Sequence, residues 1–577
     1  MPGRPDFDSP SLFCRLLDKD KGGHFSITPT ELAACTAKQQ YLPSAAILQT
    51  RYINEKGVVN LVDFFPRPKY ANILTANTAQ SSYREARSVP EELKKWLVRR
   101  VECVRGQLTL DVEVFPAFDY GRGSHETKIL QQQVRASPGC QSKTVTFHGD
   151  DEKLQLDVCI SNQGGDGSAN SPSVEFKKVQ RNGMKGEGAV AKVTLQEGQS
   201  VSFILRRDLP NHITTNITTD VLDSQQHDTQ QFWYNWLTKS RYKGAWREVV
   251  ARSLMILKML TYEPTGAIIA APTFSIPEAI GGVRNWDYRF SWVRDSSFTI
   301  YIFLRMGFTE EADSYMGFIS DRFQKSVTED GALPIMFTIR GDTEIPEYEL
   351  DHLDGYKGSK PVRIGNGAAF HQQFDIYGEL MDSIYLYNKY GKPVSWDTWV
   401  SVRKMLDFVL TIKDRYNVEL QSFVQSYENQ NMIDSSILIA PLVFFITPND
   451  PRFLNTVERI LLPPEKGGLT VTGLVHRYNS ELSDDGVGGT EGAFSMCTFW
   501  LVEALTRAGA YDRRYLVRAV NLFENMLGFS NHHSMFSEEI SQTGEQLGNT
   551  PQAFSHLALI SAAFNLDRAM NARAARV

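Results

Sequence analysis

The chain has 577 residues, of which 42% are hydrophobic and 22% charged, and these ordinary values exclude a chain that is disordered throughout. Lys and Arg number 61 against 67 Asp and Glu, so the formal net charge is −6. This balance argues against a nucleic-acid partner, which would need a basic face. The length predicts about two or three domains.

The termini, the apolar runs and the cysteines narrow the class further. The longest apolar run, 437–446, contains a proline and is too short to cross a bilayer, which takes about 20 residues. The first residues, MPGRPDFDSPSLFCRLL, contain no apolar leader segment. We therefore expect a cytoplasmic protein with no membrane partner. The 6 cysteines show no CxxC spacing, so we expect neither a metal site nor a disulfide framework.

Residues 1–215 consist of short runs of strand-like alternation that are separated by turn residues. Short strands without helical runs of similar strength predict an antiparallel β-sandwich. The predicted strands are Ala46–Tyr52, Val58–Phe65, Val98–Cys103, Leu108–Phe115, Thr144–Phe147, Leu154–Ile160, Val174–Val179, Ala191–Leu195 and Val201–Leu205.

From about residue 229 the apolar residues recur with the spacing of helices. The predicted helices are Gln230–Lys239, Ala245–Leu260, Ser296–Met306, Glu310–Gln324, Phe370–Tyr390, Trp396–Lys413, Ile433–Phe445, Pro451–Leu462, Glu491–Ala508, Tyr511–Leu527 and Pro551–Leu566. Long polar loops join them, as in an α/α toroid. We expect a β-sandwich over 1–215, a helical linker over 216–243 and a helical domain over 244–577.

The loop 281–296, GGVRNWDYRFSWVRDS, has a composition suited to binding a sugar. Neighbouring guanidinium and carboxylate groups, such as Arg294 and Asp295, can bind vicinal hydroxyls, and a tryptophan offers a flat apolar face to a pyranose ring. The alternative interpretation is a helix start whose Asp or Ser caps the first turn.

Three further loops combine turn residues with polar side chains. The loop 352–366 contains Arg363, and its glycines and proline are also typical of an ordinary turn. The loop 426–434 contains Glu428, which is either catalytic or a capping residue. The loop 537–549 contains Glu538 and Glu539, whose side chains diverge because the residues are adjacent. One of these two carboxylates could project into a cleft.

Four segments together resemble glycoside hydrolase family 15, the glucoamylase-like and bacterial-trehalase-like enzymes. They are RNWDYRFSWVRD, GSKPVRIGN, GVGGTEGAFSMCTFWLVEAL and FSEEISQTGEQLGNTPQAFSHLALI, in the family's order. The segment FDSPSLFCRLLDKDKGGHFSI resembles the trehalase-like N-terminal β-domain of the same proteins. The resemblance covers nearly the whole chain. It implies a β-sandwich followed by an (α/α)6 barrel, and inverting, exo-acting hydrolysis of terminal α-glucosidic bonds.

That reaction uses two carboxyl groups about 6.5–9.5 Å apart, an acid that protonates the leaving oxygen and a base that activates water. The resemblance assigns the base to Glu538. The expected substrate-binding residues are Trp286, Asp287, Trp292, Arg294, Asp295, Arg363 and Glu491. No cofactor and no metal are expected, and the partner is a small-molecule or oligosaccharide α-glucoside.

The chain departs from the family pattern where the general acid is expected. In the family the acid lies in a Trp-Glu motif between an LDFV-like helix and the SYENQ loop. Here about 18 residues separate Val409 from Glu428, and they contain no Trp-Glu pair. About ten of the barrel's twelve helices are predicted, so we expect an incomplete barrel and doubt the activity of this chain. Glu428, Glu491 and Glu379 are weak surrogate acids. A first strand of the sandwich is also expected to be missing.

Two other functions remain open. A non-catalytic sugar-binding or regulatory protein would bind the ligand without turnover. A disaccharide phosphorylase on a similar scaffold would use phosphate in place of water and would need no base, which the assignment of Glu538 disfavours. The sequence does not choose among trehalose, maltooligosaccharides, starch and α-1,6-linked glucans, and it leaves the oligomeric state open.

Overall fold

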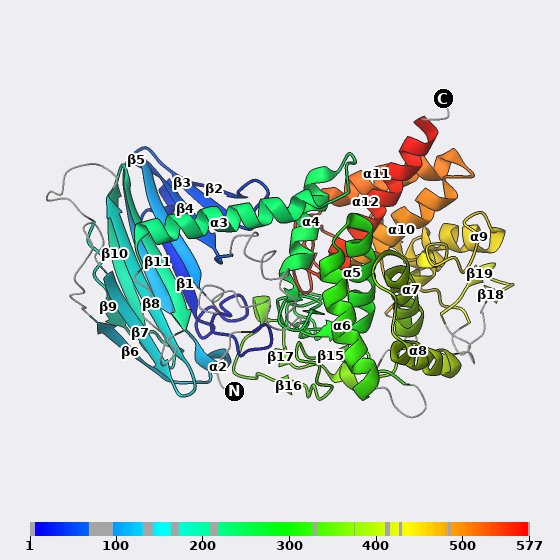
Figure 1. The fold of residues 1–577 in the computed structure, drawn as a ribbon, viewed down its shortest axis with the longest axis horizontal. Coiled ribbons are helices and arrows are strands. Elements are labelled where there is room, and N and C mark those ends of the chain that lie inside the picture. The colour runs from blue at the N-terminus through cyan, green and yellow to red at the C-terminus, as the bar shows by residue number, and fades with distance from the viewer. Residues whose placement is uncertain are drawn as a thin grey trace. The chain divides into compact units, whose positions relative to one another are not determined.

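The computed structural model describes residues 6–67, 96–130, 142–162, 172–207, 217–326, 332–373, 375–409, 416–425, 430–480, 482 and 486–574. The chain divides into two compact units, Met1–Thr238 and Lys239–Val577 (Figure 1). The first unit contains a large sheet and a long helix, and the second is mainly helical. The division places the helix before Lys239 with the first unit.

The sheet of the first unit has 11 strands that pair in the order β2-β3-β4-β5-β11-β8-β7-β6, with β1 and β10 on β5 and β9 on β10. The neighbours along this path run antiparallel. The strands are β1 (His24–Pro29), β2 (Thr36–Tyr41), β3 (Leu48–Ile53), β4 (Gly57–Phe64), β5 (Leu97–Phe115), β6 (His125–Leu130), β7 (Ser142–Gly149), β8 (Lys153–Asn162), β9 (Lys177–Val179), β10 (Gly188–Gln196) and β11 (Gln199–Arg207).

Strand β5 belongs to both layers of the sheet. Its first part pairs with β4 and β11, and its last part pairs with β1 and β10. Gly106 lies between the two parts with φ +68°, and a Cβ there would lie 2.2 Å from the carbonyl oxygen of Lys56. Glycine therefore fits where the strand changes layers, because it has no Cβ and tolerates a positive φ.

A single apolar core lies between the two layers. Val59, Phe147 and Phe203 contribute from one layer, and Ile27 and Val193 contribute from the other. Alternate residues of each strand point into this core, which is why the first part of the sequence shows a period of two. The predicted antiparallel sheet domain is confirmed.

The individual strands differ from their predictions in instructive ways. The predicted strands Val98–Cys103 and Leu108–Phe115 are one strand, β5. Val174–Val179 shortens to β9. The strands β1, β2 and β6 were not predicted. β2 is exposed along almost its whole length, so it lacks the apolar alternation by which a strand is recognised.

Helix α3 (Thr219–Thr238) begins eleven residues before the predicted helix Gln230–Lys239. Its side chain Asp223 forms an ion pair with Arg100 of β5. The Thr229 hydroxyl accepts a hydrogen bond of 2.8 Å from the backbone N–H of Arg67. These contacts attach α3 to the sheet.

The described part of the second unit contains nine α-helices. Helix α10 is buried along nearly its whole length and packs against α11 and α12, and α5 packs against α6, α7 and α12. The helices are α4 (Arg247–Met259), α5 (Val293–Met306), α6 (Thr309–Ser326), α7 (Asp375–Tyr390), α8 (Trp396–Val409), α9 (Pro451–Ile460), α10 (Ser495–Ala508), α11 (Arg513–Leu527) and α12 (Ala553–Ala574).

The predicted helix Ile433–Phe445 is wrong. Only the 3₁₀ turn η5 (Ser435–Ile439) forms there, and Phe444 adopts a left-handed φ of +61°. Pro441 lies between them and would clash with a helix through this run. Helix α7 begins at Asp375 rather than at Phe370. The search of the described residues found no helix that is both long and apolar enough to cross a membrane.

Candidate functional site

Glu538 lies immediately before β23 (Glu539–Ile540), which pairs with β22 (Ala493–Phe494) and β24 (Gln546–Leu547). Its backbone carbonyl accepts a hydrogen bond of 2.9 Å from the N–H of Ser495, at the start of α10. Its own N–H donates to the carbonyl of Asn549 over 3.1 Å. The side chain is 1% exposed. The small sheet and the start of α10 therefore hold this carboxylate in the interior.

Three donors approach the Glu538 carboxylate. The Tyr288 hydroxyl donates to Oε1 over 2.6 Å, the Asn549 backbone N–H donates to Oε2 over 3.3 Å, and the Gln552 amide donates to Oε1 over 3.4 Å. Burial raises the pKa of Glu538 to about 7, against the opposing effect of the hydrogen bonds from Tyr288 and Asn549. A carboxylate with this pKa is suited to accept a proton near neutral pH.

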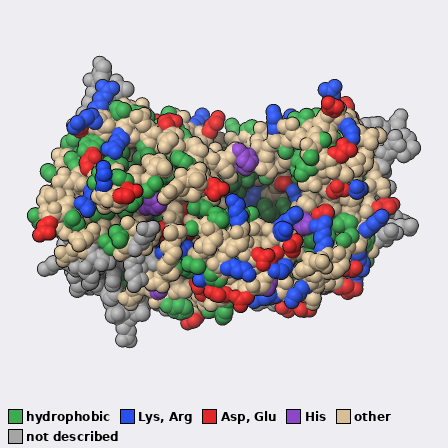
Figure 2. All heavy atoms as spheres, turned by 180° about the vertical axis from the view of Figure 1, so that it is seen from behind, with side chains coloured by type: hydrophobic (Ala, Val, Ile, Leu, Met, Phe, Trp, Pro, Cys, Tyr) green, Lys and Arg blue, Asp and Glu red, His purple; other side chains and the backbone are tan. Residues whose placement is uncertain are grey.

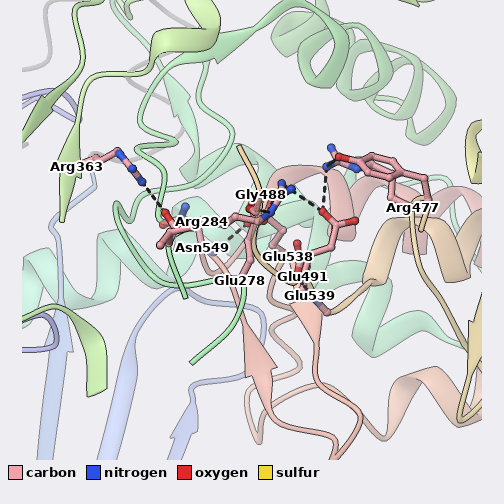
Figure 3. Close-up of polar contacts among 12 residues, drawn as sticks. Glu278, Arg284, Arg363, Arg477, Gly488, Glu491, Glu538, Glu539 and Asn549 are labelled. Atoms are coloured by element: carbon pink, nitrogen blue, oxygen red, sulfur yellow. Dashed lines mark hydrogen bonds and ion pairs between the residues drawn. The ribbon is translucent and has the colours of Figure 1, made fainter. Parts of the chain in front are cut away.

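Two further buried carboxyl groups, Glu278 and Glu539, lie beside Glu538 (Figure 3). One carboxylate oxygen of each of the three lies within 4.8 Å of the others. The N–H of Gly492 donates to Glu539 Oε2 over 2.5 Å. Burial, and then neighbouring carboxylates, raise the pKa values of Glu278 and Glu539 well above their usual range. The site therefore holds more carboxyl groups than can readily ionise together.

Two guanidinium groups join this cluster through Glu491. Arg477 Nη2 lies 3.1 Å and Arg284 Nη1 lies 3.6 Å from Glu491 Oε2. Arg284 also lies 3.9 Å from Glu278. The structure thus brings the predicted residues Glu491 and Glu538 into one network, in which Glu491 binds the two arginines.

Trp292, Arg294 and Asp295 lie together where β14 (Ser291–Trp292) meets α5. The Arg294 guanidinium lies over the Trp292 ring and 3.7 Å from the Asp295 carboxylate, and it donates to Asp375 over 3.0 Å. The Trp292 ring lies 6.3 Å from the Tyr288 ring, centroid to centroid, so this group neighbours the Glu538 network. Burial raises the pKa of Asp295 to about 6, although the Arg294 charge opposes it.

Three further predicted substrate-binding residues make contacts with other parts of the protein: Asp287, Trp286 and Arg363. The buried Asp287 carboxylate pairs with Arg289 over 2.7 Å. The Arg363 guanidinium lies over the Trp286 ring, donates to the Val283 carbonyl over 2.6 Å and lies 3.2 Å from a Glu347 oxygen. These partners fix the loops on which the polar side chains lie.

The surrogate acids lie in different environments. Glu428 lies outside the described residues. Glu379 of α7 is only partly exposed, and desolvation raises its pKa well above the usual value while the nearby Arg294 charge lowers it. Glu491 is engaged by two arginines.

Four residues of the site were not predicted as such from the sequence: Glu278, Arg284, Tyr288 and Arg477. Glu278 had a usable signal, because it is an acidic residue within the apolar stretch Ile276–Ile280 and such a residue is buried only with partners. The arginines had no such signal: Arg284 meets Glu491 from a distant part of the chain, and the pairing of Arg477 with Glu491, 14 residues later, depends on how the loop between them folds.

On the face of the molecule in Figure 2, Lys and Arg side chains are interspersed with Asp and Glu side chains.

Sequence comparisons relate the chain to known proteins. The model of the family described as Glycosyl hydrolases family 15 matches residues 244–412 and 410–564, and the one described as Trehalase-like, N-terminal matches residues 3–76. Trehalase of Mycolicibacterium smegmatis is 31% identical over 625 aligned residues, which cover 98% of this chain and 87% of the relative. Trehalase of Thermoplasma volcanium is 30% identical over 636 residues, which cover 99% and 91%.

A solved structure, a bacterial glucoamylase complexed with acarbose, matches both units of the chain. The TM-score is 0.57 at 14% identity, and the match covers 99% of this chain and 92% of the other. At this identity the likeness establishes the fold, an antiparallel sheet domain followed by a helical domain.

Proposed function

The chain belongs to glycosyl hydrolases family 15, and from this premise we propose that it hydrolyses the α-glucosidic bond of trehalose with inversion. Support for trehalose comes from the relatives, since the two described above are trehalases that align with nearly the whole chain. Maltooligosaccharides, starch and α-1,6-linked glucans are the competing substrates, and the assay below compares them with trehalose.

Glu538 is the proposed base, and its burial beneath three hydrogen-bond donors is the observation that carries the proposal. The ionised carboxylate removes a proton from water while the water attacks the anomeric carbon from the face opposite the leaving group. The Tyr288 hydroxyl holds one carboxylate oxygen in place. Attack from that face inverts the attacked anomeric carbon, so the glucose of the first subsite is released as the β-anomer, whereas the leaving glucose of trehalose keeps its α configuration.

The Trp292–Arg294–Asp295 group is the proposed subsite for the glucose ring at the non-reducing end. The guanidinium and carboxylate groups hydrogen-bond vicinal hydroxyls, and the indole ring covers an apolar face of the sugar. Support comes from the short distance between this group and Tyr288, which contacts the proposed base. Trp286, Asp287, Arg363 and Glu491 then act by shaping the walls of the site.

We propose that this chain lacks the general-acid loop and the helical hairpin that carries it. The family match breaks into two segments at residues 410–412, after the LDFV helix. The alignment with the M. smegmatis trehalase covers 625 residues, more than the 577 of this chain, so the relative contains residues without a counterpart here. Loss of a general acid lowers the rate about 10²–10⁴-fold for substrates whose leaving group must be protonated.

The exposure of apolar side chains on α8 and beyond the break also supports a missing hairpin. On α8, Trp396 is 73% and Trp399 is 44% exposed, and Phe444 beyond the break is 86% exposed. Large aromatic side chains are usually covered in a folded domain, because their burial contributes about 1.5–3 kcal/mol each. A further helical segment against α8 would cover such a surface.

The test compares trehalose with α-glucosyl fluoride. Fluoride leaves without a proton, so its hydrolysis needs the base but no general acid. We expect wild-type protein to release glucose from the fluoride and to hydrolyse trehalose slowly, with the other α-glucosides slower still. E538Q should lower fluoride hydrolysis about 10²–10⁴-fold. The exposed residue Glu545 provides the matched control, because E545Q removes a carboxylate from the same loop.

Equal fluoride hydrolysis by E538Q and wild type would refute the assigned base. Trehalose turnover as fast as fluoride turnover would refute the missing acid. A sugar-binding protein is the second candidate, favoured by the break in the family match, and calorimetric binding of trehalose without turnover of either substrate would establish it. Consumption of trehalose that requires phosphate would instead identify a phosphorylase.

A further inference from the structure

The cluster around Glu538 contains four carboxyl groups and two guanidinium groups. The side chains of Glu278, Glu491, Glu538 and Glu539 are all less than one-tenth exposed. The cations are Arg284 and Arg477. If all six groups were ionised, the interior would carry two uncompensated negative charges, which is costly in a medium of low polarity. Two protons on the carboxyl groups would make the cluster neutral.

The hydrogen-bond donors indicate which carboxyl groups are ionised. Glu538 accepts from three donors. Glu491 has both guanidinium groups within 3.6 Å. Glu539 accepts a backbone N–H, and its buried Oε1 has no hydrogen bond from any residue that the structure describes. Donors stabilise the charged form of a carboxyl group, so Glu538 and Glu491 are the members that the site supports as anions.

Glu278 is the member with the weakest support as an anion. Within the described part of the chain, its buried Oε2 has no hydrogen-bond partner, and the Arg284 guanidinium is 3.9 Å away. Glu538, Glu539 and Glu491 face it as acids, Tyr288 as a phenol, and Arg284 and Arg477 as cations.

We propose that Glu278 is a positioning residue that remains protonated at neutral pH, with Glu539 as the second neutral member, so that Glu538 can ionise. The role of Glu278 rests on the proposed function, because it acts through the base. A second anion within 4.8 Å would raise the pKa of Glu538 above neutral and remove the base from use. The high pKa values of Glu278 and Glu539 agree with this assignment.

Infrared spectroscopy tests the protonation of Glu278 without any need for activity. The carbonyl stretch of a protonated carboxyl group is separate from the bands of carboxylates. In difference spectra at pH 7, E278Q should lose one protonated-carboxyl band, whereas E491Q should lose a carboxylate band. Loss of a carboxylate band in E278Q would overturn the proposal. If E278Q does not fold, the wild-type band after subtraction of the E379Q, E538Q and E539Q contributions decides, since Glu538 with a pKa of about 7 is itself partly protonated at pH 7. The proposal requires a further protonated carboxyl group there, and its absence would refute it.

The pH dependence of α-glucosyl fluoride hydrolysis tests the effect on the base. The acidic midpoint is the pH at which the rate falls to half its maximum on the acidic side of the profile. E278Q replaces a neutral group by a neutral group, so this midpoint should move by less than about 0.3 pH unit even if the maximal rate changes. E491Q leaves the arginines uncompensated and should lower that midpoint by about one unit. A fall of one unit in E278Q would mean that Glu278 is ionised. If E538Q retained activity, the proposed function would fail, and the infrared result would still decide the protonation of Glu278.

Discussion

The 2.6 Å hydrogen bond from Tyr288 stabilises the ionised form of Glu538 and opposes the effect of burial. Y288F removes this donor, so the pKa of Glu538 should rise above its value of about 7. The acidic midpoint of fluoride hydrolysis should therefore move up by about one pH unit. A profile measured from pH 5 to pH 9, about two units either side of that midpoint, checks this.

Tyr301 on α5 supplies the control for Y288F, because its interactions are with Arg305 and other groups away from Glu538. Y301F should leave the midpoint unchanged. An equal upward shift in both variants would indicate a general loosening of the fold.

His556 couples stability to pH. The ring is buried on α12, accepts the Phe536 N–H over 3.2 Å and pairs with the Ser253 hydroxyl over 2.9 Å. Burial lowers its pKa from 6.5 to about 3. The unfolded chain therefore binds the proton first, and the contribution of His556 to stability is present above pH 6.5 and lost as pH falls toward 3.

Below pH 6.5 the unfolding free energy of the wild type should decrease more steeply than that of H556Q. The difference between the two slopes should reach up to about 1.4 kcal/mol per pH unit. Urea unfolding at several pH values measures this. H371Q, a change at an exposed position, is the control and should follow the wild type. Parallel curves for H556Q and wild type would contradict the assignment.

The residues of the site divide into those that a sequence motif can reveal and those that only the fold brings together. Trp292, Arg294 and Asp295 are neighbours in the chain, so one loop predicts their proximity. Glu278 and Glu491 meet through Arg284, and this contact depends on how loops distant in sequence pack.

At the level of elements, β5 depends on Gly106, where the strand passes between layers. G106A combines a positive φ with a Cβ that would lie 2.2 Å from the Lys56 carbonyl oxygen. Gly198 also has a positive φ, of +79°, but open space around a Cβ. G106A and G198A should each introduce backbone strain of about 1–2 kcal/mol, because alanine disfavours a positive φ. The additional steric clash should make G106A less stable than G198A by about 1 kcal/mol. Urea unfolding compares them, and equal losses would show that the clash is relieved.

The elements that were predicted correctly have a strong apolar period. β10 and α11 present such patterns because one face of each is buried. β2 is exposed on both faces, and it pairs with β3 through backbone hydrogen bonds. Such bonds do not require particular residue types, so they give no pattern by which the strand could be predicted. The apolar run around η5 was misread as a helix because apolar residues alone do not determine the type of element: η5 packs against α10 with Leu438 buried, whereas Phe444 and Phe445 are exposed.

At the level of the whole molecule, the sequence revealed two domains and their order because the apolar period changes between them. The break after α8 leads to a gain-of-function prediction. We expect that inserting, between Val409 and Tyr416, a helical segment that contains the family's Trp-Glu motif raises trehalose hydrolysis about 10²–10⁴-fold. Hydrolysis of α-glucosyl fluoride should change much less.

The control for this insertion is the same segment with the Glu of its Trp-Glu pair replaced by Gln. This control should match the full insertion in thermal stability and in the reduced exposure of Trp396 to a fluorescence quencher. It should remain slow on trehalose. Equal trehalose activity in the two insertions would contradict the absence of the acid as the cause.

The carboxylate network described above draws its groups from residues 278–288, from Arg477 and Glu491, and from residues 538–552. These segments lie on both sides of the break after Val409 and fold into one site. Under the proposed function, the base with its proton balance and the acid are therefore encoded by separate segments of the chain. On this proposal, a transcript that differs only at this junction switches turnover on or off, while the proposed sugar subsite and the ionisation of Glu538 stay unchanged.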